Sequence, residues 1–155
     1  MHEVNFDLSE LTLAVLEHEL GPAIFKEPLG EASDLKWMLP GEPPFISASF
    51  LVFGRDVQAS DVPSIITLNG FPMTSVSDIK VAGVRPGDSE EQVANHFEKL
   101  GKTPLIGYKR IRWDDDWEVQ WLTARDKIAS VICANQGLIT RTWDKRKHGQ
   151  KSPSV

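Results

Sequence analysis

The sequence predicts an α+β protein in which helices pack on an antiparallel sheet. Three observations predict this class: apolar residues recur at helical spacing in two segments, short runs of branched and aromatic residues follow each segment, and polar turns separate those runs. A length of 155 residues suits one compact domain. We therefore predict a single domain over residues 1–144 and a basic, disordered tail over residues 145–155.

The first predicted helix spans Leu8–Leu20. Its apolar residues follow the i, i+3, i+4 spacing, and most of its acidic residues lie off that stripe. Asp7 or Ser9 can cap its start, and Gly21 followed by Pro22 ends it.

The second predicted helix spans Ser89–Leu100. Asp88 and Glu91 form a capping-box pattern at its start, and Gly101 ends it. Branched and aromatic residues predict six strands, the last four as an antiparallel meander. The predicted strands are Phe45–Phe53, Ile65–Leu68, Leu105–Trp113, Trp117–Thr123, Lys127–Cys133 and Leu138–Trp143.

The chain also predicts two similar halves, each a helix followed by antiparallel hairpins, over about residues 5–75 and 76–144. The pairs Ser-Glu at 9–10 and Leu-Gly at 20–21 recur 80 residues later, at 89–90 and 100–101. An Arg-Asp pair at 55–56 recurs at 125–126, where a turn between strands is expected in each half.

The segments VRPGDSEEQV at 84–93 and LGKTP at 100–104 carry a resemblance. They resemble the opening of the helix-plus-hairpin module shared by outer-membrane assembly lipoproteins and proteinaceous β-lactamase inhibitors. The resemblance covers residues 81–133 and implies a strand, a glycine turn, a helix and a Trp-containing hairpin that binds other proteins. The chain departs from these families in having no lipidation cysteine near its start and none of the cysteines of the secreted inhibitors.

Composition and motifs indicate a cytoplasmic protein that is not an enzyme. The acidic N-terminus lacks the basic and apolar regions of a secretory signal, and Cys133 is the only cysteine. We expect its thiol to be buried in an apolar strand. The four histidines form no zinc-binding pair, and nucleophile-elbow and nucleotide-loop motifs are absent from the sequence. We therefore predict no catalytic residue, no metal and no cofactor.

Charge is distributed unevenly along the chain. Residues 1–80 hold 4 Lys/Arg against 12 Asp/Glu, and residues 81–155 hold 13 against 10. Residues 1–144 therefore carry a net charge of −9, because four of the 17 basic residues lie in the tail. An acidic body repels nucleic acid and attracts basic proteins. We expect neither nucleic acid nor a membrane as a partner.

Two segments are candidates for partner binding. The first is an acidic hairpin between tryptophans, which is either a solvated turn above core indoles or a docking patch with aromatic anchors. The second is a loop over Glu31–Glu42, with the alternative that Trp37 and Leu39 are strand residues that pack inward. The candidate residues are Trp113, Asp114, Asp115, Asp116, Trp117, Glu118, Glu31, Asp34, Trp37 and Glu42.

These features are similar in general character to those of bacteriocin immunity proteins of the pyocin type. We expect an immunity or inhibitor protein that neutralises a toxin by forming a one-to-one complex with its basic domain, with a nuclease domain that has a phosphate-binding groove as the expected target. The alternative is a non-enzymatic adaptor or secretion chaperone that binds a partner protein.

Overall fold

The structure is a computed structural model that describes residues 4–23, 25–29, 32–38, 45–53, 55–69, 79–102 and 109–150. In these residues the chain forms three α-helices, a short 3-10 helix and nine strands. In chain order the elements are β1 (Val4–Phe6), η1 (Leu8–Glu10), α1 (Leu13–Leu20), β2 (Phe25–Leu29), β3 (Ala32–Met38), β4 (Phe45–Leu51), β5 (Ile65–Asn69), β6 (Ile79–Val81), α2 (Glu90–Lys99), β7 (Arg110–Arg112), β8 (Trp117–Ala124), β9 (Lys127–Asn135) and α3 (Gln136–Gln150).

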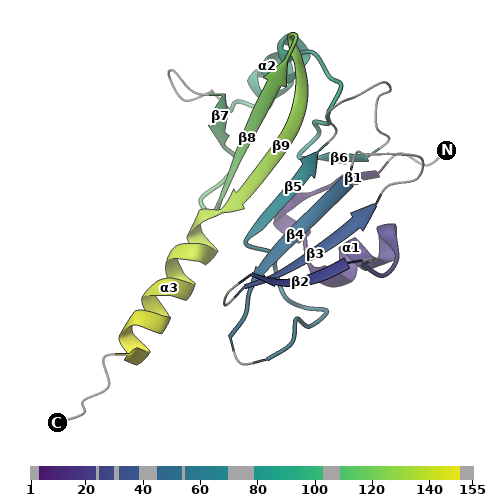
Figure 1. Ribbon diagram of the computed structural model, residues 1–155. Helices are drawn as coiled ribbons and strands as arrows, with labels where there is room; N and C mark the ends of the chain where they lie inside the picture. The colour runs from purple at the N-terminus through teal and green to yellow at the C-terminus, as the bar shows by residue number, and fades with distance from the viewer. Residues whose placement is uncertain are drawn as a thin grey trace.

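Seven of the described strands form one antiparallel sheet in the order β2-β3-β4-β5-β9-β8-β7 (Figure 1). β1 and β6 form a separate two-stranded parallel sheet. The predicted α+β class, with an antiparallel sheet, is therefore confirmed. Four predicted strands are confirmed to within two residues at each end, as β4, β5, β8 and β9. The predicted strand Leu105–Trp113 is observed only as the three residues of β7, and residues 103–108 lie outside the described part.

The predicted first helix is divided into two elements. Asp7 accepts a hydrogen bond from the backbone N–H of Ser9 at 3.0 Å and caps η1, whereas Thr12 caps α1. The remaining N–H groups at the start of α1 need partners, because a first helical turn has none of its own. The carbonyls of Asp61 and Ala59 accept from the N–H groups of Leu13 and Ala14 at 3.0 and 2.9 Å. The 55–62 loop therefore fixes the start of α1.

An ion pair holds that loop in shape. Both terminal guanidinium nitrogens of Arg55 donate to the carboxylate of Asp61 at 2.7 Å, and the backbone N–H of Gln58 donates to it at 2.7 Å. The hydrogen bonds from Arg55 lower the pKa of Asp61 from its ordinary value. The carboxylate therefore stays ionised where the loop meets α1.

The predicted second helix is confirmed, but its cap differs from the prediction. Ser89 and Gln92 form the capping box of α2, with hydrogen bonds of 2.8 and 3.1 Å, in place of Asp88 and Glu91. Asp88 instead accepts hydrogen bonds from the backbone N–H and the guanidinium of Arg85. Its carboxylate shapes the turn before the helix.

The order of elements gives no support for two repeated halves. Ser89 caps α2, whereas Ser9, its counterpart at the offset of 80 residues, lies inside η1. Arg125 and Asp126 form the turn between β8 and β9 with positive φ angles of 54° and 64°. The matching Arg55 lies instead in the loop that contacts α1. The sequence identities therefore mark structurally different positions.

The predicted strand Leu138–Trp143 is wrong, because these residues belong to α3. Ile139, Thr140, Thr142 and Trp143 have strand propensity, which explains the error. The helix begins where the side-chain oxygen of Asn135 accepts a hydrogen bond from the N–H of Leu138 at 2.9 Å. α3 continues through residues 145–150, which were predicted to belong to a disordered tail; residues 151–155 lie outside the described part.

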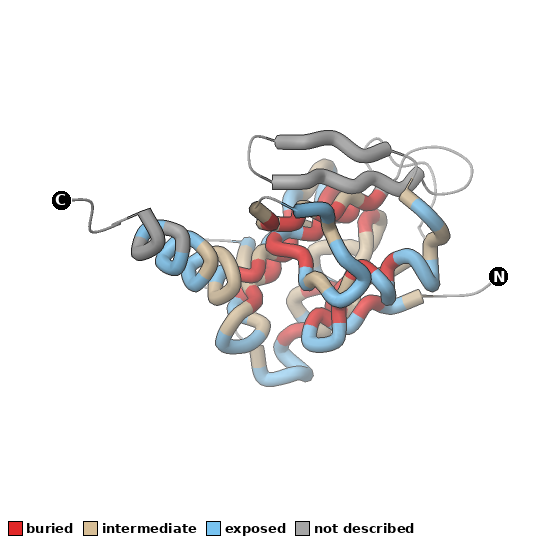
Figure 2. The backbone as a smooth tube through the Cα atoms, turned by 90° about the horizontal axis from the view of Figure 1, so that it is seen from below, coloured by how far each residue is buried: buried red, intermediate tan, exposed pale blue. Residues whose placement is uncertain are grey.

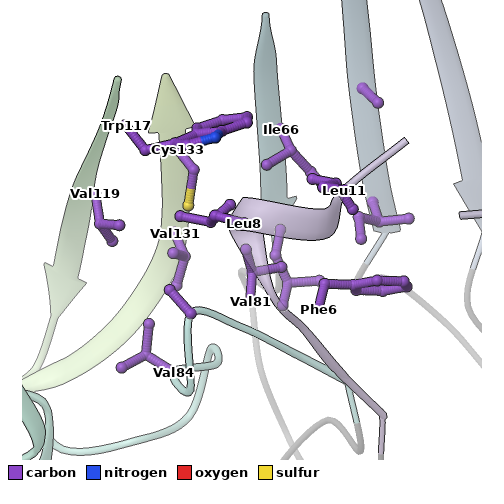
Figure 3. Packing of buried hydrophobic residues seen from close by; sticks show 14 of the residues in the cluster. Phe6, Leu8, Leu11, Ile66, Val81, Val84, Trp117, Val119, Val131 and Cys133 are labelled. Carbon is purple, nitrogen blue, oxygen red and sulfur yellow. The ribbon is translucent and has the colours of Figure 1, made fainter. Parts of the chain in front are cut away.

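The core lies between the sheet and the N-terminal elements (Figure 3). Phe6, Leu8 and Leu11 of the N-terminal segment pack toward β5 and β9, where Ile66 and Cys133 are buried. α1 and α2 add their own buried residues to the same cluster. The whole cluster therefore covers one face of the sheet.

The β8–β9 turn yields a stability prediction. Asp126 has a left-handed backbone, which disfavours residues with a Cβ atom and suits glycine. We expect Asp126→Gly to raise the free energy of unfolding by about 1 kcal/mol, measured by urea denaturation. The control is Lys127→Gly, one residue later in β9, which is expected to lower it by about 0.5–1 kcal/mol. A loss of stability in Asp126→Gly would contradict the strain assigned to this turn.

Candidate functional site

The two faces of the sheet differ in burial, because successive residues of a strand point to opposite faces. On β8, Trp117, Val119 and Trp121 are buried, and the residues between them are partly or fully exposed. This alternation confirms the predicted strand with one buried and one wet side. Figure 2 shows the same change between buried and exposed residues along the chain. The covered face is the one that packs against α1 and α2.

We call the opposite face of β4, β5, β9 and β8 the open face. Cross-strand pairing fixes its members, since residues paired across neighbouring strands share a face. They are Phe45, Ser47, Ser49, Ile65, Thr67, Asn69, Glu118, Gln120, Leu122, Ser130, Ile132 and Ala134, with Glu118 at the edge next to β7.

The centre of the open face has no charged side chain. Leu122 is 49% exposed and Ile65 is 36% exposed, and their neighbours are small, aliphatic or amide residues. The hydroxyl of Ser130 donates to the side-chain oxygen of Asn69 at 3.2 Å. A solvated face of an antiparallel sheet ordinarily carries polar residues. Seven of the twelve members of the open face are polar or charged, so it is a largely polar surface on which Ile65 and Leu122 are exposed apolar residues that a partner could cover.

Charged residues border the open face at the β7 edge. Arg110 of β7 lies 3.8 Å from Glu118 of β8, and cross-strand pairing places both on the open face. Arg112 on β7 is exposed. An uncharged centre with a charged rim is the arrangement found at protein–protein interfaces.

The acidic hairpin is the turn that joins β7 to β8, and intramolecular bonds hold it. One carboxylate oxygen of Asp114 accepts from the N–H groups of Asp116 and Trp117 at 2.8 and 2.7 Å. Asp116 accepts from the guanidinium of Arg141 on α3 at 2.9 Å. Asp115 is exposed and has no such bond within the described residues. Two of the three carboxylates therefore shape the turn and join it to α3.

The two tryptophans beside this turn differ in burial. Trp117 is only 3% exposed and belongs to the core. Trp113 is half-buried, with its ring edge-on to Phe97 at 6.4 Å and the ammonium of Lys102 4.9 Å from its centroid. For Trp117, the structure therefore agrees with the first alternative, a solvated turn above an indole that belongs to the core. Glu118 lies on β8 at the edge of the open face. Partner binding by the acidic residues stays a prediction.

The second predicted segment is largely a strand. Asp34 and Trp37 lie in β3, which pairs with β2 and β4, so the expected loop is replaced by a sheet strand at these positions. Glu31 and Glu42 lie outside the described residues. Partner binding by these four residues stays a prediction.

Reactive groups in the described part are few. His96 makes a 3.1 Å hydrogen-bonding contact with the carbonyl of Ala82, which gives it a structural partner. Among the described residues, no three or more His, Cys, Asp or Glu side chains are grouped so that they could hold a metal ion. Cys133 is fully buried, and burial raises the pKa of its thiol above the ordinary value.

The thiol of Cys133 gives a direct test of this packing. Because the thiolate is the reactive form and the sulfur is buried, we expect almost no reaction with a disulfide reagent in the native protein at neutral pH. One equivalent of thiol should react after unfolding in denaturant, as followed by reagent absorbance. Rapid labelling of the native protein would contradict the packing of β9 against the core.

Sequence reasoning did not identify the open face. The available signal was that alternate residues of Ile65–Asn69 and of 130–134 are uncharged in a protein with 25% charged residues. That signal has meaning only after the strands are paired, because no single strand shows the whole surface.

Comparison of the chain with protein-family models, with curated proteins and with solved structures gave no match. Within the described residues, no helix has the length and apolar character needed to span a membrane.

Proposed function

We propose that this chain is a cytoplasmic inhibitor of the immunity type, which binds the basic domain of a toxin protein through the open face of its sheet. The observation that carries the proposal is the uncharged centre of that face, with Leu122 and Ile65 exposed and charged residues at the β7 edge. Burial of such a centre against a partner supplies affinity, and the rim excludes water and orients the partner.

The charge of the chain supports a basic partner. Residues 1–135 hold 12 Lys/Arg against 21 Asp/Glu, a net charge of −9. A basic toxin domain, such as a nuclease with a groove for phosphate, would associate rapidly with this body at low salt. The exposed carboxylate of Asp115 lies in the turn next to the β7 edge and adds to that attraction.

The resemblance of residues 81–133 to an inhibitor module also supports the proposal. The predicted helix and hairpin correspond to α2, β8 and β9. The alternative function, an adaptor or secretion chaperone, uses the same face. It differs in binding a targeting segment rather than the toxic domain.

The test is to produce the chain together with the protein encoded by the neighbouring gene. An inhibitor is expected to form a one-to-one complex in gel filtration and to restore the growth of cells that produce the partner alone. Complex formation without protection from toxicity would favour the adaptor. No complex, together with no protection, would count against both functions.

A matched pair of variants connects this test to the open face. Ile132→Arg places a charge at the centre of the face, and Glu91→Arg places one on the exposed surface of α2. Protection should be lost in the first variant and retained in the second, with both variants folded by circular dichroism. Equal protection by both would show that another surface binds the toxin.

A further inference from the structure

The last helix carries charge opposite to that of the rest of the chain. Residues 1–135 have a net charge of −9, and residues 136–155 have +4 from five basic residues and one aspartate. α3 extends away from the sheet, so this positive charge is separated from the acidic body (Figures 1 and 2). A partner that is basic throughout would be repelled by α3. A basic partner that also contacts α3 must therefore have an acidic region there.

Two contacts near the start of α3 fix its orientation. The guanidinium of Arg141 donates to Asp116 at 2.9 Å, and the ring of Trp143 meets Phe53 edge-on at 5.8 Å. Residues two apart on a helix point to opposite sides, so these contacts hold α3 from both sides. The orientation of α3 relative to the sheet is therefore defined before a partner binds.

One side of α3 combines an exposed indole with a cation. Ile139, Trp143 and Lys147 are four residues apart, so they follow one another along the same side of the helix. Ile139 is half-buried, Trp143 is 46% exposed and Lys147 is exposed. Trp143 is the largest exposed apolar side chain in the described part of the protein. We call this side of the helix, with Ile139, Trp143 and Lys147, the indole side.

The indole side begins where the open face ends. Ile65, which is 36% exposed, pairs with Ala134 near the end of β9, and α3 follows β9 without a loop. Trp143 is seven residues after the first residue of α3, or about 10 Å along the helix axis. Val52 is buried in the core cluster, whereas Phe53 beside it is half-buried and meets the indole, so this contact lies outside the core. An interface of standard size buries about 800 Å² of each partner and can cover both regions.

We propose that the toxin-binding surface continues from the open face onto the indole side, where Trp143 is an anchor and Lys147 meets an acidic patch of the toxin domain. This inference rests on the proposed function, because it extends the same interface. Tryptophan is enriched among the residues that contribute most to binding, and an indole already held on a helix loses little conformational freedom. Opposite charges beside the anchor fix the register of the two proteins. The toxin domain then has a basic region for the acidic body and an acidic patch beside it for α3.

Trp143→Ala tests the anchor in the complex with the co-produced partner. Calorimetry should give a Kd about 30-fold higher than that of the unchanged chain. The control is Leu100→Ala, which shortens an apolar side chain of 47% exposure at the end of α2 and should leave the Kd unchanged. Circular dichroism shows whether each variant is folded. A folded Trp143→Ala chain with the Kd of the unchanged protein would overturn the proposal.

Two charge reversals on opposite sides of α3 test the acidic patch. Lys147→Glu and Lys145→Glu change the net charge equally at exposed positions, but only Lys147 belongs to the indole side. Lys147→Glu should raise the Kd about 10-fold, and Lys145→Glu should change it by less than about threefold. The difference should shrink between about 0.1 M and about 1 M salt, because the Debye length falls from about 10 Å to about 3 Å. Equal effects of the two reversals, or tighter binding by Lys147→Glu, would overturn the acidic patch.

Further outcomes separate this inference from the proposed function. A complex that is weakened by Ile132→Arg, but not by Trp143→Ala or Lys147→Glu, would overturn the extension onto α3 and leave the open face as the binding site. The absence of any complex would overturn both. Sedimentation equilibrium of the chain alone should show a monomer. A dimer that Trp143→Ala dissociates would assign the indole side to a second copy of the chain and overturn the proposal.

Discussion

Replacing Phe97 with alanine is expected to lower the free energy of unfolding by about 3–5 kcal/mol, the range typical of deleting a buried phenylalanine. Phe97 is fully buried on α2, stacked on Trp121 at 5.5 Å and edge-on to Trp113 at 6.4 Å. The deletion removes these aromatic contacts and leaves a cavity where α2 meets β8. The lost stability has two parts. One is the transfer free energy of the buried ring, and the other is the cost of the cavity that remains because the site collapses only in part.

Urea denaturation with tryptophan fluorescence measures this change, and Trp121 reports on the contact itself. The control is Glu98→Ala, at the next position of α2, where the side chain is exposed and the change should stay within about 0.5 kcal/mol. A loss of less than about 1 kcal/mol in Phe97→Ala would mean that α2 is not packed against the sheet as described.

The second large effect concerns binding. Leu122→Arg places a charge at the most exposed apolar position of the open face and should weaken the complex with the co-produced partner about 100-fold, or about 2.8 kcal/mol. Isothermal titration calorimetry measures the Kd. The arginine lowers the affinity in two ways. A basic partner repels its charge, and burial in an apolar contact removes water from it.

Leu100→Arg is a closely matched control. Leu100 is 47% exposed, against 49% for Leu122, but it caps the C-terminus of α2 away from the open face. The same substitution there should leave the Kd within about threefold of the unchanged protein, which is within the effect of a single rim charge. If both variants lost affinity equally, the effect would reflect net charge and not the open face.

Local signals in the sequence predicted much of the fold. Gly21 and Gly101 end helices α1 and α2 with positive φ angles, and the alternation along Trp117–Thr123 predicted the buried side of β8. These features depend on backbone preference and on burial within one element. They therefore can be recognised in a single sequence.

The errors arose where a tertiary contact determines local structure. Leu138–Trp143 has the composition of a strand but forms part of a helix. The side chain of Asn135 caps the start of that helix, and Arg141 on the helix pairs with Asp116. Gly137 lies so close to Asp116 that an added Cβ atom would be 1.9 Å from its carboxylate oxygen. The sequence around 138 contains no sign of a partner 22 residues earlier in the chain.

The candidate site was predicted only in part for a similar reason. The acidic turn was found because three consecutive aspartates are visible locally, yet two of them serve the turn and α3. The open face combines residues from β4, β5, β8 and β9, whose pairing joins positions as far apart as Ser49 and Ala134 through Ile65. Its composition becomes visible only when the register is known.

The most direct measurement of the central claim is photo-crosslinking from single positions of the purified, labelled chain in a lysate of the source cells. Because Cys133 is buried, a benzophenone maleimide can be attached selectively at Gln120→Cys on the open face or at Glu91→Cys on α2. We expect one discrete adduct with a basic protein from position 120 and none from position 91. Adducts of the same protein from both positions, or from position 91 alone, would contradict binding at the open face.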